Sequence, residues 1–168
     1  MKNLFAVLVF AAAVSFSGSA QNTAAQKKIA GEYTYETECM GVEGDGSQTL
    51  KAYGYGNSKN DAVEQAKKNA VRDVLFKGIL KGKNECSPKP ILNEPNIQEK
   101  HEDYFNKFFA DGGEYLNYTS MNDMPIKLFS AGKDRKTAAE GVTYGITVIV
   151  KRSELKKKMI TDNILVIP

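Results

Sequence analysis

The segment from Leu50 to Ile79 constrains the fold more than any other part of the chain, because an apparent strand passes through two glycines into an apparent helix. Gly54 and Gly56 end the strand, and Ser58 is a favourable N-cap. Asp61 follows three residues later, where a carboxylate interacts well with the helix dipole. The pattern predicts a strand and a helix joined by a very short connection.

These glycines have two possible interpretations, a phosphate cradle and a tight corner. A dinucleotide fingerprint needs a third glycine where Lys59 stands, and a P-loop needs Gly-Lys-Ser/Thr, which the segment lacks. Ala62, Ala66 and Ala70 recur at every fourth residue, and small side chains let a helix lie close to its neighbour. The sequence therefore favours a corner that brings helix and strand together.

The remaining patterns predict an α+β fold. Strands are expected at 31–40, 48–56, 114–121, 126–131 and 142–151. Helices are expected at 58–80, after Asn96 as N-cap with Glu99 completing a box-like start, and after Ser153 as N-cap. Asp45-Gly46 suits the turn of the first hairpin. The order β-β-α-α-β-β-β-α predicts a single antiparallel sheet with the helices packed on one face.

Residues 1–20 have the features of a secretory signal peptide: one lysine, an apolar run and a small-residue cleavage site. Residues 21–31 are expected to form a flexible tether, and residues 32–168 a single domain. The apolar run is too short to span a bilayer, and no later run predicts a transmembrane segment in the mature chain. We expect an exported protein, periplasmic or secreted; the alternative is an N-terminal anchor that is retained.

Cys39 and Cys86 are the only two cysteines. In an exported protein they are expected to form a disulfide that stabilises the fold by about 3 to 4 kcal/mol on the loop-entropy model. The alternative is a pair of buried thiols. Their spacing from each other and from His101 fits no zinc pattern, and Cys-x-x-Cys is absent.

Composition and motifs disfavour several classes of function. Only three of the 23 basic residues are arginines, and acidic residues are mixed among the basic ones, so no nucleic-acid partner is expected. The basic run 151–158 is interpreted as a solvated helix face, with phosphate or anionic lipid as the alternative. His101 is the only histidine, which leaves no pattern for a catalytic triad. We expect no cofactor, metal or catalytic residues; the alternative is a hydrolase built on two converging carboxylates.

Aromatic residues concentrate between residues 104 and 118, and two interpretations stay open. They fill the core, or they form a surface for a partner or ligand. The candidates for such a surface are Tyr104, Phe105, Phe109, Tyr115 and Tyr118.

The stretch "KAYGYGNSKNDAVEQAKKNAVRDVL" resembles the signature of a bacterial envelope domain found in small LPP-type lipoproteins and in the N-terminal domain of flagellar assembly protein T. The strand ending in glycine and the alanines at every fourth residue carry the resemblance, together with "ITVIVKRSELKKKM" near the C-terminus. It covers roughly Gln48 to Leu80 and Val142 to Met159. The resemblance implies a non-catalytic α+β module that assembles or stabilises envelope complexes.

We therefore expect an exported binding module whose partner is another envelope protein. The alternative is a small-ligand or glycan binder that uses the aromatic residues between 104 and 118.

Overall fold

The computed structural model describes residues 36–121, 125–130 and 141–166, and the side chains of residues 126–130 are outside this description. The predicted signal peptide and tether also lie outside the described residues. The described part belongs to one unit, Tyr35–Pro168.

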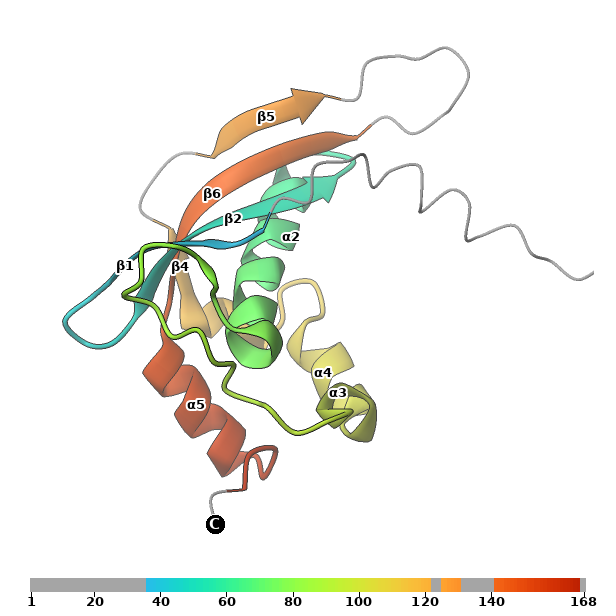
Figure 1. The fold of residues 1–168 in the computed structure, drawn as a ribbon. Coiled ribbons are helices and arrows are strands. Elements are labelled where there is room, and N and C mark those ends of the chain that lie inside the picture. Colours follow the sequence, from blue (N-terminus) through green and yellow to red (C-terminus); the bar gives the residue numbers. More distant parts are fainter. Residues whose placement is uncertain (1–35, 122–124, 131–140, 167–168) are drawn as a thin grey trace, which may run out of the picture. The chain divides into compact units, whose positions relative to one another are not determined.

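The α+β prediction is confirmed, because the described strands form one mainly antiparallel sheet and the helices pack against it (Figure 1). The elements are β1 (Glu38–Val42), β2 (Gln48–Gly56), α2 (Lys59–Arg72), the π-helical turn η1 (Asp73–Lys77), β3 (Lys81–Gly82), α3 (Ile97–Lys100), α4 (Glu102–Phe108), the 3-10 helix η2 (Glu114–Tyr118), β4 (Thr119–Met121), β5 (Ile126–Ser130), β6 (Val142–Val150) and α5 (Arg152–Thr161).

The strands form one sheet in the order β3-β1-β2-β6-β4, and β5 pairs with a second stretch of β6. The central pair is β2 with β6, antiparallel along its whole length from Gln48↔Val150 to Gly56↔Val142. The two-residue strand β3 runs parallel to β1, so the sheet is antiparallel apart from this one short pairing. A bulge between Cys39 and Gly41 shifts the register of β1 against β2.

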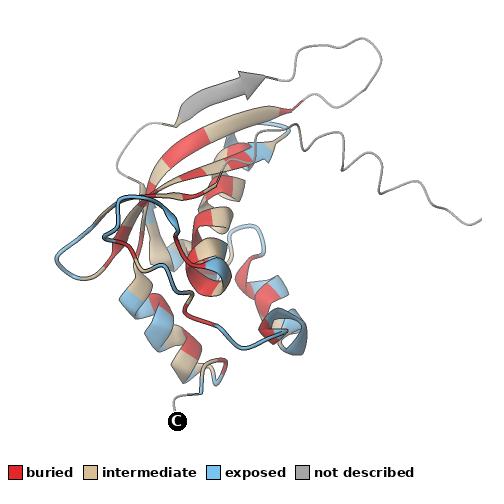
Figure 2. Ribbon diagram, viewed as in Figure 1, coloured by how far each residue is buried: buried red, intermediate tan, exposed pale blue. Residues whose placement is uncertain are grey.

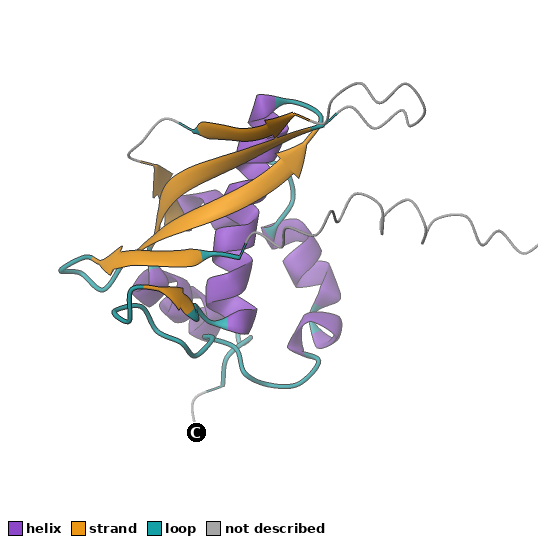
Figure 3. Cartoon of the chain, turned by 45° about the horizontal axis from the view of Figure 1, so that its top comes forward, coloured by secondary structure: helices purple, strands orange, loops and turns teal. Residues whose placement is uncertain are grey.

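The sheet buries one face under the helices (Figures 1 and 3). Leu50 lies opposite Val148, and Ala52 lies opposite Ile146; all four side chains are buried (Figure 2). The intervening residues, such as Thr49 and Lys51, are only partly buried, as the two-residue period of a strand requires. A single core joins this face to α2, α4 and α5.

Three local predictions were wrong. Residues 114–118, predicted as part of a strand, form the 3-10 helix η2, because that turn buries the Tyr115 ring completely. Asn96 does not cap a helix with its side chain; it has a left-handed backbone, φ 60°, and the helix after it is broken at His101. The last helix begins at Arg152, with Lys151 and not Ser153 at its N-cap.

Candidate functional site

The two cysteines form the predicted disulfide, with 5.8 Å between the Cα atoms of Cys39 and Cys86. Because the two sulfur atoms are bonded to each other, the alternative of two unpaired buried thiols is wrong. The bond ties β1 to the segment that follows β3. A disulfide at this position is compatible with an exported protein.

The residues singled out at the strand–helix corner have the arrangement that the sequence indicates. The Ser58 hydroxyl accepts from the Asp61 N–H at 3.2 Å, and the Asp61 carboxylate accepts from the Ser58 N–H at 3.0 Å. Ala62, Ala66 and Ala70 are fully buried against the sheet.

The two glycines of the corner lie in close contact with α2. A Cβ added at Gly54 would lie 2.1 Å from the Ala62 carbonyl oxygen and 2.3 Å from the Ala66 nitrogen. A Cβ at Gly56 would lie 2.6 Å from the Ala62 nitrogen. Helix backbone thus lies directly against both glycines, which serve the close packing of α2 on β2.

The aromatic cluster is mainly core. Phe105 is 5% exposed, Phe109 7% and Tyr115 0%. These three side chains belong to the core, so the hypothesis that they form a docking surface is wrong. Their rings pack on one another, for example Phe109 on Tyr115 with 6.0 Å between centroids. Burying a large apolar ring stabilises the folded state, whereas exposing it to water does not, and this explains why the three rings lie in the core.

The two remaining candidates of the cluster are half-buried and serve packing as well. The Tyr104 hydroxyl donates to the Asp162 carboxylate at 2.6 Å, and this bond joins α4 to the end of α5. The pKa of Tyr104 is raised, mainly because the phenol is partly buried and secondly because it donates a hydrogen bond to the Asp162 carboxylate. Tyr118 stacks on Phe108 with 6.1 Å between ring centroids.

A carboxylate that the sequence did not single out holds η2 against α2. Glu64 accepts from the Gly112 N–H at 3.0 Å and from the Tyr115 hydroxyl at 2.7 Å. These two donors hold the pKa of Glu64 below its usual value, in that order of importance. No period or motif distinguishes this glutamate from the others on α2, so only the fold identifies it.

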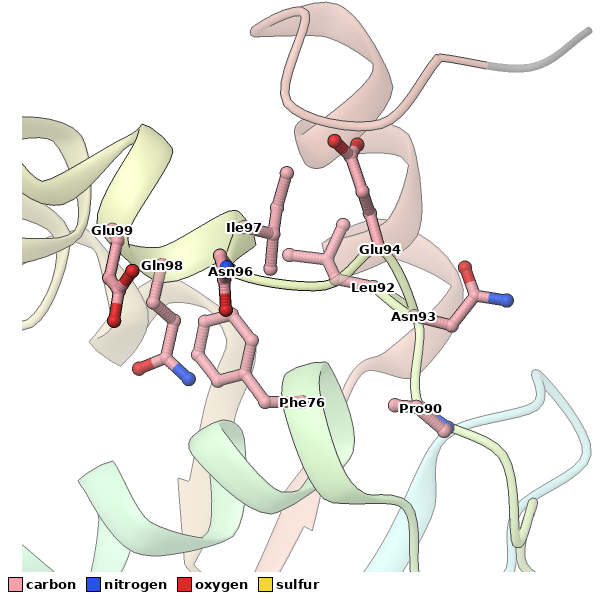
Figure 4. A pocket seen from close by; sticks show the side chains of 9 residues that line it. All are labelled: Phe76, Pro90, Leu92, Asn93, Glu94, Asn96, Ile97, Gln98 and Glu99. Carbon is pink, nitrogen blue, oxygen red and sulfur yellow. The ribbon is translucent and has the colours of Figure 1, made fainter.

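A groove, which we call the Phe76 groove, opens beside η1 and has a volume of about 570 Å³ (Figure 4). Its apolar lining comes from Phe76, Pro90, Leu92 and Ile97. Phe76 is half-buried, and its ring packs edge-on against Phe105 with 5.0 Å between centroids. The groove therefore abuts the aromatic core without exposing it.

The rim of the Phe76 groove is polar and acidic. Figure 4 shows the Phe76 ring facing Asn96 and Gln98, with the Glu99 carboxylate next to them. Glu94, also on the rim, forms an ion pair with Lys100. Glu99 is exposed and has no ion-pair partner among the residues that the structure describes.

The irregular segment that forms the groove is fixed by backbone hydrogen bonds. The Ile91 N–H donates to the Val74 carbonyl at 3.1 Å, and the Leu92 N–H donates to the Leu75 carbonyl at 2.8 Å. Arg152 adds two more bonds, to the carbonyls of Val74 and Lys89 at 3.3 and 3.0 Å. Burial lowers the pKa of this guanidinium. The groove is thus preformed rather than a gap in a loose loop.

Sequence reasoning missed this groove. The prolines in "SPKPILNEPN" indicate by themselves only a break in regular structure. The signal that could have found it is the pair Ile91 and Leu92 inside this segment, because two adjacent apolar residues in a loop often pack on the domain.

Among the described residues, no group of three or more His, Cys, Asp or Glu side chains is placed to hold a metal ion. His101 is half-buried at the break between α3 and α4. No helix in the described ranges is long and apolar enough to cross a membrane.

Comparison of the chain with protein-family models, with curated proteins and with solved structures gives no match. The resemblance to the LPP-type lipoprotein and flagellar assembly domain thus stays a prediction.

Proposed function

We infer that this protein is an exported, non-catalytic binding module that captures a segment of another envelope protein in the Phe76 groove. The observation that carries the proposal is the groove itself: a preformed apolar floor with a polar rim. This is the anatomy of a protein interface, in which an apolar anchor is buried and a ring of polar side chains surrounds it. Its volume of about 570 Å³ accommodates one or two side chains of a partner.

The charge of the rim specifies the chemistry of the partner segment. Glu99 is exposed on the groove, and Glu102 and Asp103 are exposed at the start of α4. None of the three forms an ion pair within the part of the chain that the structure describes. The preferred segment therefore places an apolar side chain between lysines or arginines, since complementary charge favours encounter and orientation.

The proposal is tested by position-specific crosslinking in the cell. A photo-reactive amino acid replaces Gln98, which is exposed on the groove, and, as a matched control, Asn57, which is exposed between β2 and α2. We expect a defined envelope protein to crosslink from position 98 and not from position 57. Glu99→Lys should weaken that crosslink, because it places a cation where the partner carries its own.

Two results would contradict the proposal. One is the same set of crosslinked products from both positions, which would show unspecific contact. The other is no product from position 98 in a protein that is exported and folded. The captured protein is then purified, and its affinity is measured for the unmodified chain and for Glu99→Lys.

A further inference from the structure

The loop from Lys77 to Lys83, which we call the Leu80 loop, presents one apolar side chain to solvent. Leu80 is 73% exposed, while its neighbour Ile79 is buried. Single exposed apolar residues are common on protein surfaces, so exposure alone assigns no role. The surroundings of Leu80 supply the further evidence.

The Leu80 loop is held rigidly on both sides. The Ile79 N–H donates to the Ser87 carbonyl at 3.2 Å, and the Lys83 N–H donates to the Cys39 carbonyl at 2.9 Å. Between these bonds, Lys81 and Gly82 pair with β1, and the disulfide at Cys86 closes the segment. Leu80 cannot fold back on the core, and a partner that binds it incurs little cost in loop ordering.

Lysines surround Leu80. Lys77 and Lys83 are exposed, and neither forms an ion pair with any residue in the described ranges. Lys81 is also exposed and pairs with Glu36 at 2.9 Å. The loop thus displays an apolar residue flanked by two unpaired cations.

These are the features that the Phe76 groove requires of its occupant. We propose that the groove of one copy of this chain binds the Leu80 loop of a second copy, with Leu80 against Phe76, Leu92 and Ile97, and with Lys77 and Lys83 facing the acidic rim. This inference rests on the proposed role of the groove as a binding site; the second copy occupies the groove in the purified protein, where no envelope partner is present. The charge complementarity between an acidic rim and a basic loop selects a second copy among possible occupants.

The proposed contact joins two different surfaces, a loop and a groove. The contact is either reciprocal, in an isologous two-fold dimer where each copy gives a loop and accepts one, or heterologous, in which case it builds rings or filaments. Both surfaces border the same short stretch of chain, from Phe76 to Lys83. The stoichiometry in solution distinguishes the two arrangements.

The test is sedimentation of the purified, oxidised protein over a range of concentrations. We expect reversible self-association that weakens with added salt, because charges at an exposed rim are screened. Leu80→Ser should raise the dissociation constant about tenfold or more, since a leucine side chain no longer leaves water. Val166→Ser is the matched control, because Val166 is 80% exposed at a distant position in the sequence and should change nothing.

Mixing two defective variants gives the sharper test. Leu80→Ser keeps a normal groove, and Glu99→Lys keeps a normal loop, so each should be largely monomeric alone. Together they can form one intact contact, and the mixture should contain a one-to-one complex. Lys157→Glu, an exposed lysine on α5, controls for the effect of changing charge.

Several outcomes would overturn this inference. A monomer at all concentrations would do so, as would self-association that is insensitive to Leu80→Ser, or a mixture that stays monomeric. Binding of the monomer to phosphatidylglycerol vesicles through Leu80 would assign the loop to a membrane surface instead. A monomeric protein that still gives a crosslinked envelope protein from position 98 would leave the proposed function intact and remove only the second copy.

Discussion

Replacing Gly54 by alanine tests the central packing of this fold. The added Cβ would lie 2.1 Å from the Ala62 carbonyl oxygen and 2.3 Å from the Ala66 nitrogen, both of which are helix backbone. Carbon atoms in contact prefer separations of about 3.5 Å or more, so α2 must move away from β2 by roughly 1 Å or more. Because no flexible side chain can yield instead, the helix moves as a body.

The cost of this movement can be estimated. Overpacking a core typically costs about 1 to 3 kcal/mol, and the contact with rigid backbone places Gly54→Ala at or above the top of that range. The alanine also reduces the conformational freedom of the unfolded chain, and this effect stabilises the protein by about 0.4 to 1 kcal/mol. We therefore expect the free energy of unfolding to fall by about 3 kcal/mol, a large part of the 5 to 15 kcal/mol typical of a domain.

The assay is equilibrium unfolding in urea, with Gly44→Ala as the matched control. A Cβ added at Gly44 would have no atom within 4 Å, so this alanine variant should lie within about 0.5 kcal/mol of the original protein. A Gly54→Ala variant as stable as Gly44→Ala would refute the close approach of α2. Stabilisation of the original protein by inorganic phosphate that is lost in Gly54→Ala would revive the phosphate cradle.

Three further predictions concern stability. Removing the Cys39–Cys86 bond, which spans 47 residues, should cost about 4 kcal/mol by the loop-entropy relation; urea unfolding with and without reductant measures this, and an unchanged midpoint would contradict it. The pKa of Glu64 is lowered in the folded state, so the ionised carboxylate stabilises the protein at neutral pH, and this stabilisation is lost as the pH falls through the folded pKa. In a plot of Tm against pH, Glu64→Gln should therefore make the decrease of Tm at acid pH less steep. The folded pKa of Tyr104 is raised, so its contribution is complete below the unfolded value of about 10 and is lost at higher pH. Tyr104→Phe should therefore lose less stability on going to alkaline pH than the original protein does, and an identical alkaline limb would argue against the bond to Asp162.

Local chemistry was sufficient to predict the strand–helix corner. Ser58 and Asp61 make their two hydrogen bonds within four residues of each other, so no distant partner decides the outcome. The alanine period and the glycines likewise describe a contact between elements adjacent in sequence. The apolar patterns of 48–56 and 142–151 indicate two strands, but their pairing with each other joins distant parts of the chain and is not contained in local chemistry.

Prediction failed where a distant partner decides the local structure. Tyr115 has a side chain that suits a strand, yet Glu64 on α2 and the buried Phe109 ring hold it in a 3-10 turn. The left-handed backbone of Asn96 breaks the expected capping geometry, and no local signal distinguishes this asparagine from one at a normal N-cap. At Tyr115, contacts across the fold outweigh propensity; at Asn96, the left-handed backbone is one that asparagine adopts more readily than most residues.

The Phe76 groove shows why the aromatic cluster was the wrong place to expect a binding surface. Phe105, Phe109 and Tyr115 are the residues with most to gain from burial, and the fold uses them to join α4 and η2 to α2. Phe76 lies at their edge and is only partly covered, because the segment from Pro90 to Asn96 passes beside it without regular structure. The prolines of this segment keep it out of sheet and helix until α3 begins at Ile97, so an apolar hollow with a polar rim remains beside the ring. The search for a partner therefore begins with the ring that the core leaves half-covered.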